Sequence, residues 1–360
     1  MAQETDIRYR FEYERRVRVG FIGCGGHAWR NVYPAFQYAP VDLVAVCDLD
    51  AGLAAAFGRQ FGAARTYASH AEMLATEALD AVFIVTNYDE RGHPRAAGLA
   101  LEALAAGCHV WMEKPPAASV AEVDAMAAAA HRADRFVMVG FKKMFFPAIE
   151  KAKALMARPD FGAPSSVAIR YPQPLPPEED RGDDRKMAGF LDHIVHPASI
   201  LLYLMGPLRS VYFHREPVNG GAPALLRFQS GAVGTLHLAA GQSGTSPLER
   251  VEVVGSGANL VVENGVRLTY YRPGSPGAYG RAGSFLTDDD SAPLHWEPEF
   301  SLGQLYNKNL FLLGYAPEVR YFCACVLDGT PPERAGLDDA REILRVYEAF
   351  RGPDGVEAHL

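Results

Sequence analysis

The sequence predicts two domains: an α/β domain with a doubly wound parallel sheet, then an α+β domain with an antiparallel sheet. The first prediction rests on short apolar strands that alternate with helices up to about residue 140. The second rests on short strands between residues 208 and 271, which glycine, proline and asparagine separate without intervening helices. A length of 360 residues also favours two domains. We place an N-terminal extension at 1–16 and the two domains at 17–141 and 142–360, with the alternative that the closing helices pack back on the first domain.

The first domain opens with a buried strand at 17–22 and a glycine-rich turn of the pattern G-x-G-x-x-A. In a dinucleotide-binding turn of this kind, the first glycine permits a tight bend and the second lets the backbone approach a pyrophosphate. A helix from about 28 to 38 would then direct its unpaired N–H groups at the phosphates. The residues expected to line this cofactor site are Gly23, Cys24, Gly25, Gly26 and His27.

An acidic residue, Asp48, follows the second predicted strand at 41–47 and lies 25 residues after Gly23. A carboxylate at this place accepts hydrogen bonds from the adenosine ribose and repels a 2′-phosphate, so it favours NAD over NADP. Leu49 supplies no cation for such a phosphate, which favours the same choice. The alternative is an ordinary turn aspartate after a strand.

Capping residues and apolar runs mark the remaining elements of the first domain. Ser69 with Glu72, and Ser119 with Glu122, form capping boxes at two helix starts. Pro94 suits the first turn of a helix and Gly107 suits its end. We expect helices at 51–61, from 69, at 93–106 and at 119–133, and strands at 81–86, 109–112 and 136–140.

The second domain is predicted to begin with a helix at 147–157 and a strand at 165–171. A loop rich in proline and acidic residues follows at 172–186, and an apolar helix at 189–205. Segment 272–293 is expected to be a solvated loop, with a lid or a dimer arm as the alternative. Two helices, at about 318–327 and 338–350, close the chain.

Composition and charge exclude several classes of function. The net charge of −8 without a basic stripe argues against nucleic acid as a partner. Five cysteines without zinc-type spacing suggest reduced thiols in the cytoplasm and no metal site. The N-terminus lacks an apolar signal core, and we expect no run long enough to cross a membrane.

Three motifs in this order resemble the glucose-fructose oxidoreductase/inositol dehydrogenase/rhizopine-catabolism (Gfo/Idh/MocA) family. They are the G-x-G-x-x-A turn, the tripeptide Glu113-Lys114-Pro115 after a strand, and Asp192-x-x-x-His196 in the apolar helix. The resemblance spans roughly residues 17–350. It implies a Rossmann domain and a second domain with a large, open, mostly antiparallel sheet. Because exposed apolar sheet faces tend to be covered, we expect a homodimer or homotetramer.

Lys114 follows the strand at 109–112 and should lie at the carboxyl edge of the sheet, where open α/β folds bind ligands. An ammonium group there could stabilise negative charge that develops on a reacting oxygen. The resemblance implies that Lys114 is catalytic and that Glu113 borders the nicotinamide ribose.

Asp192 and His196 are four residues apart, so a helix would present them on one side. Imidazole titrates at about pH 6.5, and it can therefore accept a proton near neutrality. The resemblance implies that His196 is the general base and that Asp192 orients the proton transfer or the substrate. His193 is an alternative base, and Pro197 is expected to bend the helix at His196.

Further candidates follow other strands of the first domain. The resemblance implies that Thr86 and Asn87 flank the cofactor, whereas the longer loop here leaves His93 either beside the cofactor or at a helix start. Lys142 and Lys143 lie after the strand at 136–140, where they would contact substrate hydroxyls or form a solvated pair.

These residues together predict an NAD-dependent dehydrogenase that reversibly oxidises a secondary hydroxyl of a sugar, glycoside or cyclitol, without a metal. The alternatives are a reductase, a sugar oxidoreductase that retains its cofactor, and a non-catalytic NAD-binding regulator on the same fold. A regulator would not need Lys114, Asp192 and His196 together, so an enzyme is favoured.

Overall fold

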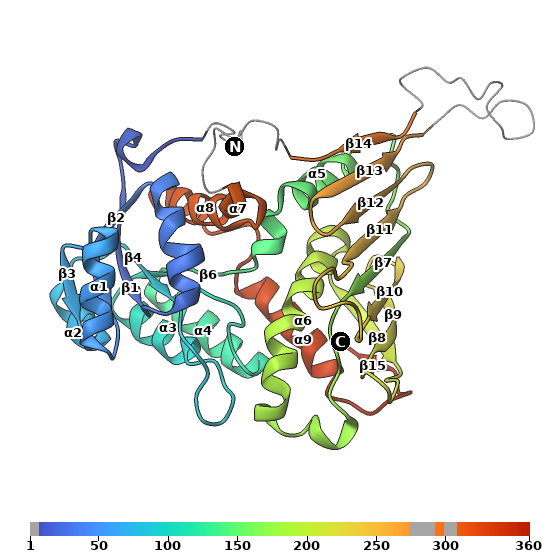
Figure 1. The fold of residues 1–360 in the computed structure, drawn as a ribbon, viewed down its shortest axis with the longest axis horizontal. Helices are drawn as coiled ribbons and strands as arrows, with labels where there is room; N and C mark the ends of the chain where they lie inside the picture. Colours follow the sequence, from blue (N-terminus) through green and yellow to red (C-terminus); the bar gives the residue numbers. More distant parts are fainter. Residues whose placement is uncertain (1–6, 274–291, 299–307) are drawn as a thin grey trace, which may run out of the picture. The chain divides into compact units, whose positions relative to one another are not determined.

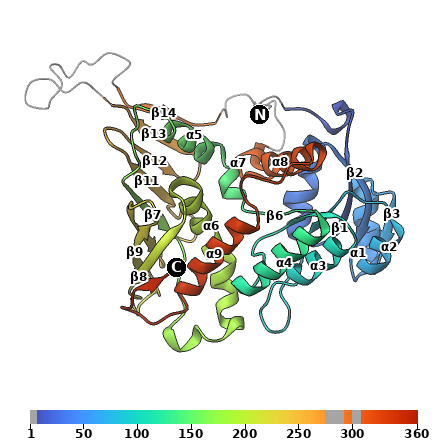
Figure 2. The ribbon, with the colours of Figure 1, turned by 180° about the vertical axis from the view of Figure 1, so that it is seen from behind.

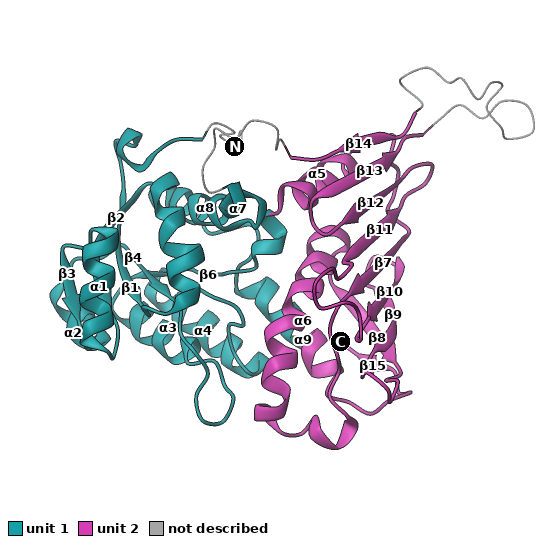
Figure 3. Cartoon of the chain, in the orientation of Figure 1, with its two compact units in different colours: residues 1–145, 307–344 teal, residues 146–306, 345–360 magenta. Residues whose placement is uncertain are grey.

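The computed structural model describes residues 7–273, 292–298 and 308–360. The chain forms two units, shown in Figure 3: residues 1–145 with 307–344, and residues 146–306 with 345–360. The first unit extends past the expected boundary at 141 because the short helix η4 (Lys142–Phe145) packs against α8 (Tyr315–Asp328) within that unit. The predicted loop or lid at 272–293 lies, for residues 274–291, outside the described residues.

The first unit contains a six-stranded parallel sheet with the order β3-β2-β1-β4-β5-β6. This is the doubly wound order of a Rossmann domain, whose ligands bind at the carboxyl ends of the strands where the order reverses. Here that reversal lies between β1 and β4, so the predicted fold is confirmed. The strands are β1 (Val17–Ile22), β2 (Val41–Cys47), β3 (Arg65–Tyr67), β4 (Ala81–Ile84), β5 (His109–Met112) and β6 (Val137–Val139).

Helices pack on this sheet as their apolar residues require. Helix α1 (Ala51–Phe61) packs on β2 and β3, and α2 (His70–Thr76) packs on β1, β2 and β3. Helices α3 (Ala96–Ala105) and α4 (Val120–Ala133) lie side by side against β4, β5 and β6 (Figures 1 and 2). The hydroxyls of Ser69 and Ser119 accept the backbone N–H three residues on, as the capping boxes predict.

Two helix predictions in this unit need correction. The segment predicted as a helix from 28 to 38 is a π-helical turn, η2 (Ala28–Val32), followed by a 3₁₀ helix, η3 (Tyr33–Tyr38). Pro34 lacks an N–H, so a regular α-helical ladder loses a bond there. The helix expected from 93 begins only at Ala96, because Pro94 pairs with Tyr88 across the preceding loop.

The second unit is built on a nine-stranded sheet with the order β14-β13-β12-β11-β7-β10-β9-β8-β15. Every described neighbouring pair is antiparallel except β7 with β10, which is parallel, so the predicted sheet is confirmed. Its strands are β7 (Ser166–Tyr171), β8 (Leu208–Phe213), β9 (Ala222–Phe228), β10 (Val233–Leu238), β11 (Arg250–Val254), β12 (Asn259–Glu263), β13 (Arg267–Tyr271), β14 (Leu294–Trp296) and β15 (Ala358–His359).

Helices α5 (Pro147–Met156) and α6 (Asp184–Met205) cover one face of this sheet (Figure 1). Buried and exposed side chains alternate along strands such as β9, as a sheet with one covered face requires. On the other face apolar side chains remain exposed, among them Leu225 (61%) and Val233 (53%).

Helix α6 differs from its prediction in its first residue and in the length of its apolar run. It begins at Asp184, five residues early, because the Asp183 carboxylate accepts the Arg185 N–H and caps the helix. With 22 residues it is long and apolar enough to cross a membrane, which contradicts the expectation that no run has this length. However, 67% of its most apolar window is buried, and core helices pass the same test.

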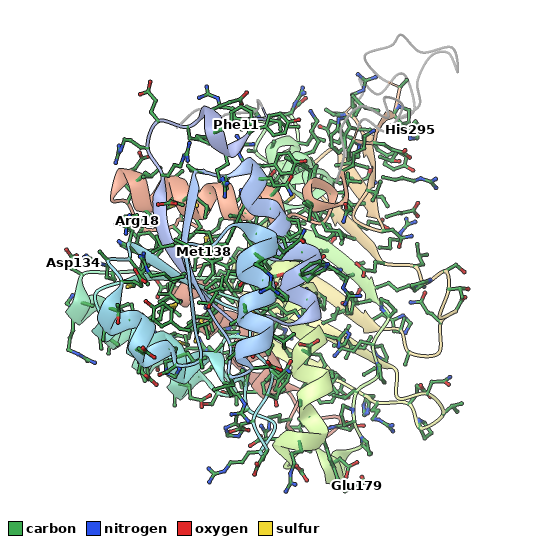
Figure 4. The ribbon with its side chains drawn as sticks, turned by 60° about the vertical axis from the view of Figure 1, so that its left-hand side comes forward. Phe11, Arg18, Asp134, Met138, Glu179 and His295 are labelled. Carbon is green, nitrogen blue, oxygen red and sulfur yellow. The ribbon has the colours of Figure 1, made fainter. Side chains whose placement is uncertain are left out.

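Buried apolar side chains form the core of the first unit on both faces of its sheet. Figure 4 shows Met138 of β6 among tightly packed side chains, whereas Phe11 lies at the surface. The chain ends with α9 (Leu337–Ala349), which starts in the first unit, and with β15 in the second.

Candidate functional site

The turn after β1 contains glycines of two kinds. A side chain at Gly23 would lie 1.9 Å from the Val85 carbonyl oxygen, and its φ of +108° also disfavours other residues. A side chain at Gly25 or Gly26 would meet nothing within 4 Å. Packing within the chain therefore explains why residue 23 is a glycine, but it does not explain the glycines at 25 and 26. Open space over two consecutive glycines is what a pyrophosphate needs to approach the backbone.

Asp48 lies directly beside this turn. Its Oδ2 accepts the Cys24 N–H at 2.7 Å and its Oδ1 accepts the Asp50 N–H at 2.9 Å. The Cys24 N–H is thereby occupied, so Cys24 contributes to the turn by holding the carboxylate in place. Leu49, the next residue, is 87% exposed and is apolar, so it provides no positive charge beside Asp48.

Thr86 follows β4, the strand next to β1. Its hydroxyl is buried and has no hydrogen-bond partner among the described residues. An orphaned hydroxyl near the carboxyl edge, two open glycines and the carboxylate of Asp48 are the groups that a dinucleotide requires. The residues present therefore fit NAD.

A chain of hydrogen bonds links polar side chains that follow three strands of the first sheet. The Nε2 of His27 lies 2.9 Å from Oε1 of Glu113 and 3.4 Å from the hydroxyl of Tyr315. Lys142 donates to that hydroxyl at 3.0 Å, and its Nζ lies 4.7 Å from the centre of the Tyr315 ring. We call Glu113, His27, Tyr315 and Lys142 the polar network.

The tautomer of His27 follows from its neighbours. The Asn31 side-chain amide lies 3.3 Å from Nδ1, so Nδ1 accepts and the Nε2–H donates to Glu113. The other oxygen of Glu113 accepts the backbone N–H of Lys114 at 3.0 Å. Glu113 thus connects the catalytic candidate Lys114 to the polar network.

Electrostatic effects act most clearly on Lys142. Burial lowers the pKa of its ammonium group, Lys143 and Lys114 lower it further, and Glu113 and Glu318 oppose the change. Lys143 is buried, so it is not half of a solvated pair. The polar network therefore contains a cation whose charge depends on its surroundings.

The sequence did not indicate Tyr315 and Glu318, because they lie in α8, 201 and 204 residues after Lys114. The available signal was the spacing of Tyr315 and Glu318, which are three residues apart and so share a face of this helix. Of the other candidates, His93 precedes α3, which begins at Ala96, and its Nδ1 lies 4.0 Å from a carboxylate oxygen of Glu122. Asn87 is an exposed residue of the same loop.

The second unit carries the other catalytic candidates on α6. His196 is 9% exposed, and its ring centre lies 6.4 Å from that of Tyr171 in β7. Burial, together with Glu249 and Asp192, raises the pKa of Tyr171. Asp192 thus lies close enough to Tyr171 to affect the ionisation of its hydroxyl. Like Tyr315, Tyr171 is a tyrosine beside candidate residues that the sequence did not indicate.

His193 differs from His196 in exposure and contacts. Its side chain is 55% exposed, its Nδ1 donates to the Gly189 carbonyl at 2.9 Å, and Asp192 lies 3.8 Å away. Helix α6 continues through Pro197. Within the part of the chain that the structure describes, no group of three His, Cys, Asp or Glu residues is arranged to hold a metal ion.

Comparison with known families identifies both halves of the chain. Residues 17–141 match the family described as "Oxidoreductase family, NAD-binding Rossmann fold". Residues 149–261 match the family described as "GFO/IDH/MocA C-terminal domain".

Individual relatives align with nearly the whole chain. The myo-inositol 2-dehydrogenase of Thermotoga maritima is 25% identical over 92% of this chain and 95% of its own. The D-apiose dehydrogenase of Paraburkholderia graminis is 25% identical over 93% of this chain and 87% of its own. The structure of a dehydrogenase from Chromobacterium violaceum has the same fold, with a TM-score of 0.75 at 22% identity, over 93% of this chain and 94% of that one.

The two kinds of glycine predict opposite outcomes for two similar substitutions. Gly23→Ala should lower the free energy of unfolding by about 2 kcal/mol or more, because the new methyl group overlaps the Val85 carbonyl. Gly25→Ala should leave the free energy of unfolding within about 0.5 kcal/mol of the wild type, because nothing lies within 4 Å of the new methyl group. It should nevertheless weaken NADH binding at least tenfold, about 1.4 kcal/mol, because the methyl group occupies the space through which the pyrophosphate approaches the backbone. Urea unfolding and fluorescence titration measure the two effects; normal NADH affinity in Gly25→Ala would contradict the assignment.

Proposed function

Because this chain belongs to the Gfo/Idh/MocA oxidoreductase family and contains its NAD-binding Rossmann domain, we propose that it reversibly oxidises a secondary hydroxyl of a sugar, glycoside or cyclitol. The observation that carries the proposal is the open glycine pair beside Asp48, with Lys114 at the carboxyl edge of the same sheet. The relatives named above act, by their names, on a cyclitol and on a sugar, which supports this substrate class.

The residues that would hold NAD are the turn from Gly23 to His27, Asp48 at the adenosine ribose, and Thr86 and Glu113 near the nicotinamide end. Bound NAD⁺ supplies the hydride acceptor. Lys114 stabilises the negative charge that develops on the substrate oxygen. His196 accepts the hydroxyl proton and Asp192 orients it, while Lys142, Lys143 and His193 contact substrate hydroxyls.

The choice of His196 over His193 as the general base rests on the burial of the two side chains. His196 is largely buried beside Tyr171, whereas His193 is exposed and already donates through Nδ1 to a helix carbonyl. A general base works in a site from which water is excluded, and this favours His196. A cytoplasmic location belongs to the same proposal, and five free, buried cysteines support a reducing compartment.

The substrate class is tested by a screen. Sugars, glycosides and cyclitols are offered with NAD⁺, and NADH absorbance is followed. We expect turnover with at least one compound that carries a secondary hydroxyl, and the reverse reaction with the matching ketone. Tight NAD binding without turnover of any compound in either direction would favour a regulator instead.

Cofactor choice is predicted from Asp48. NAD(H) should bind at least tenfold more tightly than NADP(H), about 1.4 kcal/mol, because the carboxylate repels a 2′-phosphate. Titration calorimetry with both cofactors measures the ratio, and Asp48→Ser should reduce it. Equal affinities in the wild type would contradict the role of Asp48.

The catalytic roles predict a ranked series of variants. His196→Ala should lower turnover by roughly 10²–10⁴-fold, the usual effect of a positioned acid–base group, with little change in NAD affinity. Lys114→Ala should be as severe and should also weaken cofactor binding, whereas His193→Ala should be mild. Steady-state kinetics with the substrate from the screen gives the ranking. If His193→Ala is inactive and His196→Ala is active, the base has been assigned to the wrong histidine.

We also propose a homodimer or homotetramer joined through the exposed face of the nine-stranded sheet. Leu225, Val233 and Tyr271 are exposed on this sheet, and apolar surface of this kind is usually covered. Light scattering should therefore give a multiple of the 39.2 kDa chain mass. Leu225→Glu should dissociate the assembly, whereas Val218→Glu, in an exposed turn, should not. A wild-type monomer at micromolar concentration would disprove the assembly.

A further inference from the structure

The first unit contains a buried carboxyl group that the proposed function does not use. Glu318, in α8, is 0% exposed, and neither of its carboxyl oxygens has a hydrogen-bond partner among the described residues. Burial of a carboxyl group without a partner is costly. Groups of this kind are found most often at functional sites, where the cost serves a purpose.

The packing of α8 brings Glu318 to the polar network. A side chain at Gly314, just before α8, would lie 2.2 Å from the Lys142 carbonyl oxygen, so this helix end is tightly packed on η4. The Glu318 N–H donates to the Gly314 carbonyl at 3.0 Å. Tyr315, which accepts the hydrogen bond from Lys142, comes three residues before Glu318 and therefore shares its helix face.

Three charged groups act on Glu318, and each comes from a segment outside α8. Glu113 follows β5, Lys142 belongs to η4, and Arg334 precedes α9. The Arg334 guanidinium is fixed 4.0 Å from the centre of the Phe145 ring and donates to the Met144 carbonyl at 3.0 Å. Burial and Glu113 raise the pKa of Glu318 well above its ordinary value, while Lys142 and Arg334 lower it.

Lys142 experiences the reverse effects. Burial lowers the pKa of its ammonium group, as do Lys143 and Lys114, whereas Glu113 raises it and an ionised Glu318 raises it to a smaller extent. Each group therefore favours the charged form of the other. When two groups interact in this way, they lose protons as a pair.

We propose that Glu318 is a positioning residue that acts through Lys142. At lower pH Glu318 is a neutral acid; when it releases its proton to solvent, the resulting carboxylate keeps Lys142 as an ammonium ion against Tyr315. The first proton lost from the pair thus leaves an ion pair and not a neutral amine. The consequence for catalysis, a cation maintained at the candidate site over a wider pH range, rests on the proposed function.

The coupling is tested without any ligand, by urea unfolding of the full chain over a range of pH. The folded chain retains the Glu318 proton above the pKa of the unfolded chain, so wild-type stability should fall as pH rises. Relative to Glu318→Gln, the unfolding constant of the wild type should rise by up to tenfold per pH unit. Lys142→Met should extend this rise to higher pH, because Glu318 then loses a favourable cation. In the double variant the extension should disappear, so the two substitutions should not be additive.

Asp339 provides the matched control. It is a partly buried carboxyl of the same unit whose pKa burial also raises. Unlike Glu318, it accepts a backbone N–H, from Ala335, and the charged groups that act on it are Asp338 and Glu342. Asp339→Asn combined with Lys142→Met should therefore be additive at every pH. Parallel wild-type and Glu318→Gln stability curves, or additivity between Glu318→Gln and Lys142→Met, would overturn the proposal. If Glu318→Gln does not fold, the test is the comparison of wild type with Lys142→Met: the rise of the unfolding constant should extend to higher pH in Lys142→Met, and an unchanged pH range would overturn the proposal.

A second experiment measures the effect on the site. NAD⁺ and NADH are titrated against the wild type, Glu318→Gln and Asp339→Asn over the same pH range. Deprotonation of Lys142 removes a positive charge that opposes the nicotinamide cation, so the ratio of NAD⁺ to NADH affinity should then rise. The rise should occur about one pH unit lower in Glu318→Gln than in the other two proteins. The same pH in all three would overturn the link to the site. If neither cofactor binds the wild type, the proposed function fails, and the unfolding experiment still decides the coupling.

Discussion

The backbone of Gly23 passes so close to the Val85 carbonyl that no side chain fits between them. This contact joins β1 to the residues that follow β4, at the point where the order of the parallel sheet reverses. The turn that results leaves Gly25 and Gly26 open and brings the Cys24 N–H to Asp48. The phosphate and ribose parts of the proposed dinucleotide site therefore depend on one steric constraint.

Burial decides the chemistry of the site next to this turn. Lys142 and Glu318 both lose hydration, which disfavours the charged form of each, and the charge of each partly offsets this loss for the other. The polar network shares the charge of Glu113 between the imidazole of His27 and the backbone of Lys114. In a buried cluster of this kind the hydrogen bonds polarise one another, so a change of charge at one member affects the others.

In the second unit one sheet provides two different surfaces. Its covered face holds α6, and with it Asp192 and the buried His196. Its other face exposes apolar residues on neighbouring strands. Since strand side chains alternate between the faces, each strand contributes residues both to the face that carries His196 and to the exposed face through which we propose that copies of the chain associate.

Local patterns in the sequence determined most of the fold and the cofactor turn. Apolar strands, capping serines and the spacing of Gly23, Gly25 and Asp48 are short-range signals, and they are sufficient to predict the parallel sheet and its ligand edge. Helix boundaries were predicted less well where a single residue overrides the pattern: Pro34 changes the helix type, Pro94 delays α3, and Asp183 starts α6 early.

Only the tertiary structure decided which residues complete the site in the first unit. Tyr315 and Glu318 are remote in sequence from Lys142 and Glu113, and no local pattern links them. They meet because α8 returns to pack on η4, where Gly314 allows close contact with the Lys142 backbone. Burial, and the pKa changes that follow from it, is a property of that packing, so the charges of the site could not be read from the order of its residues.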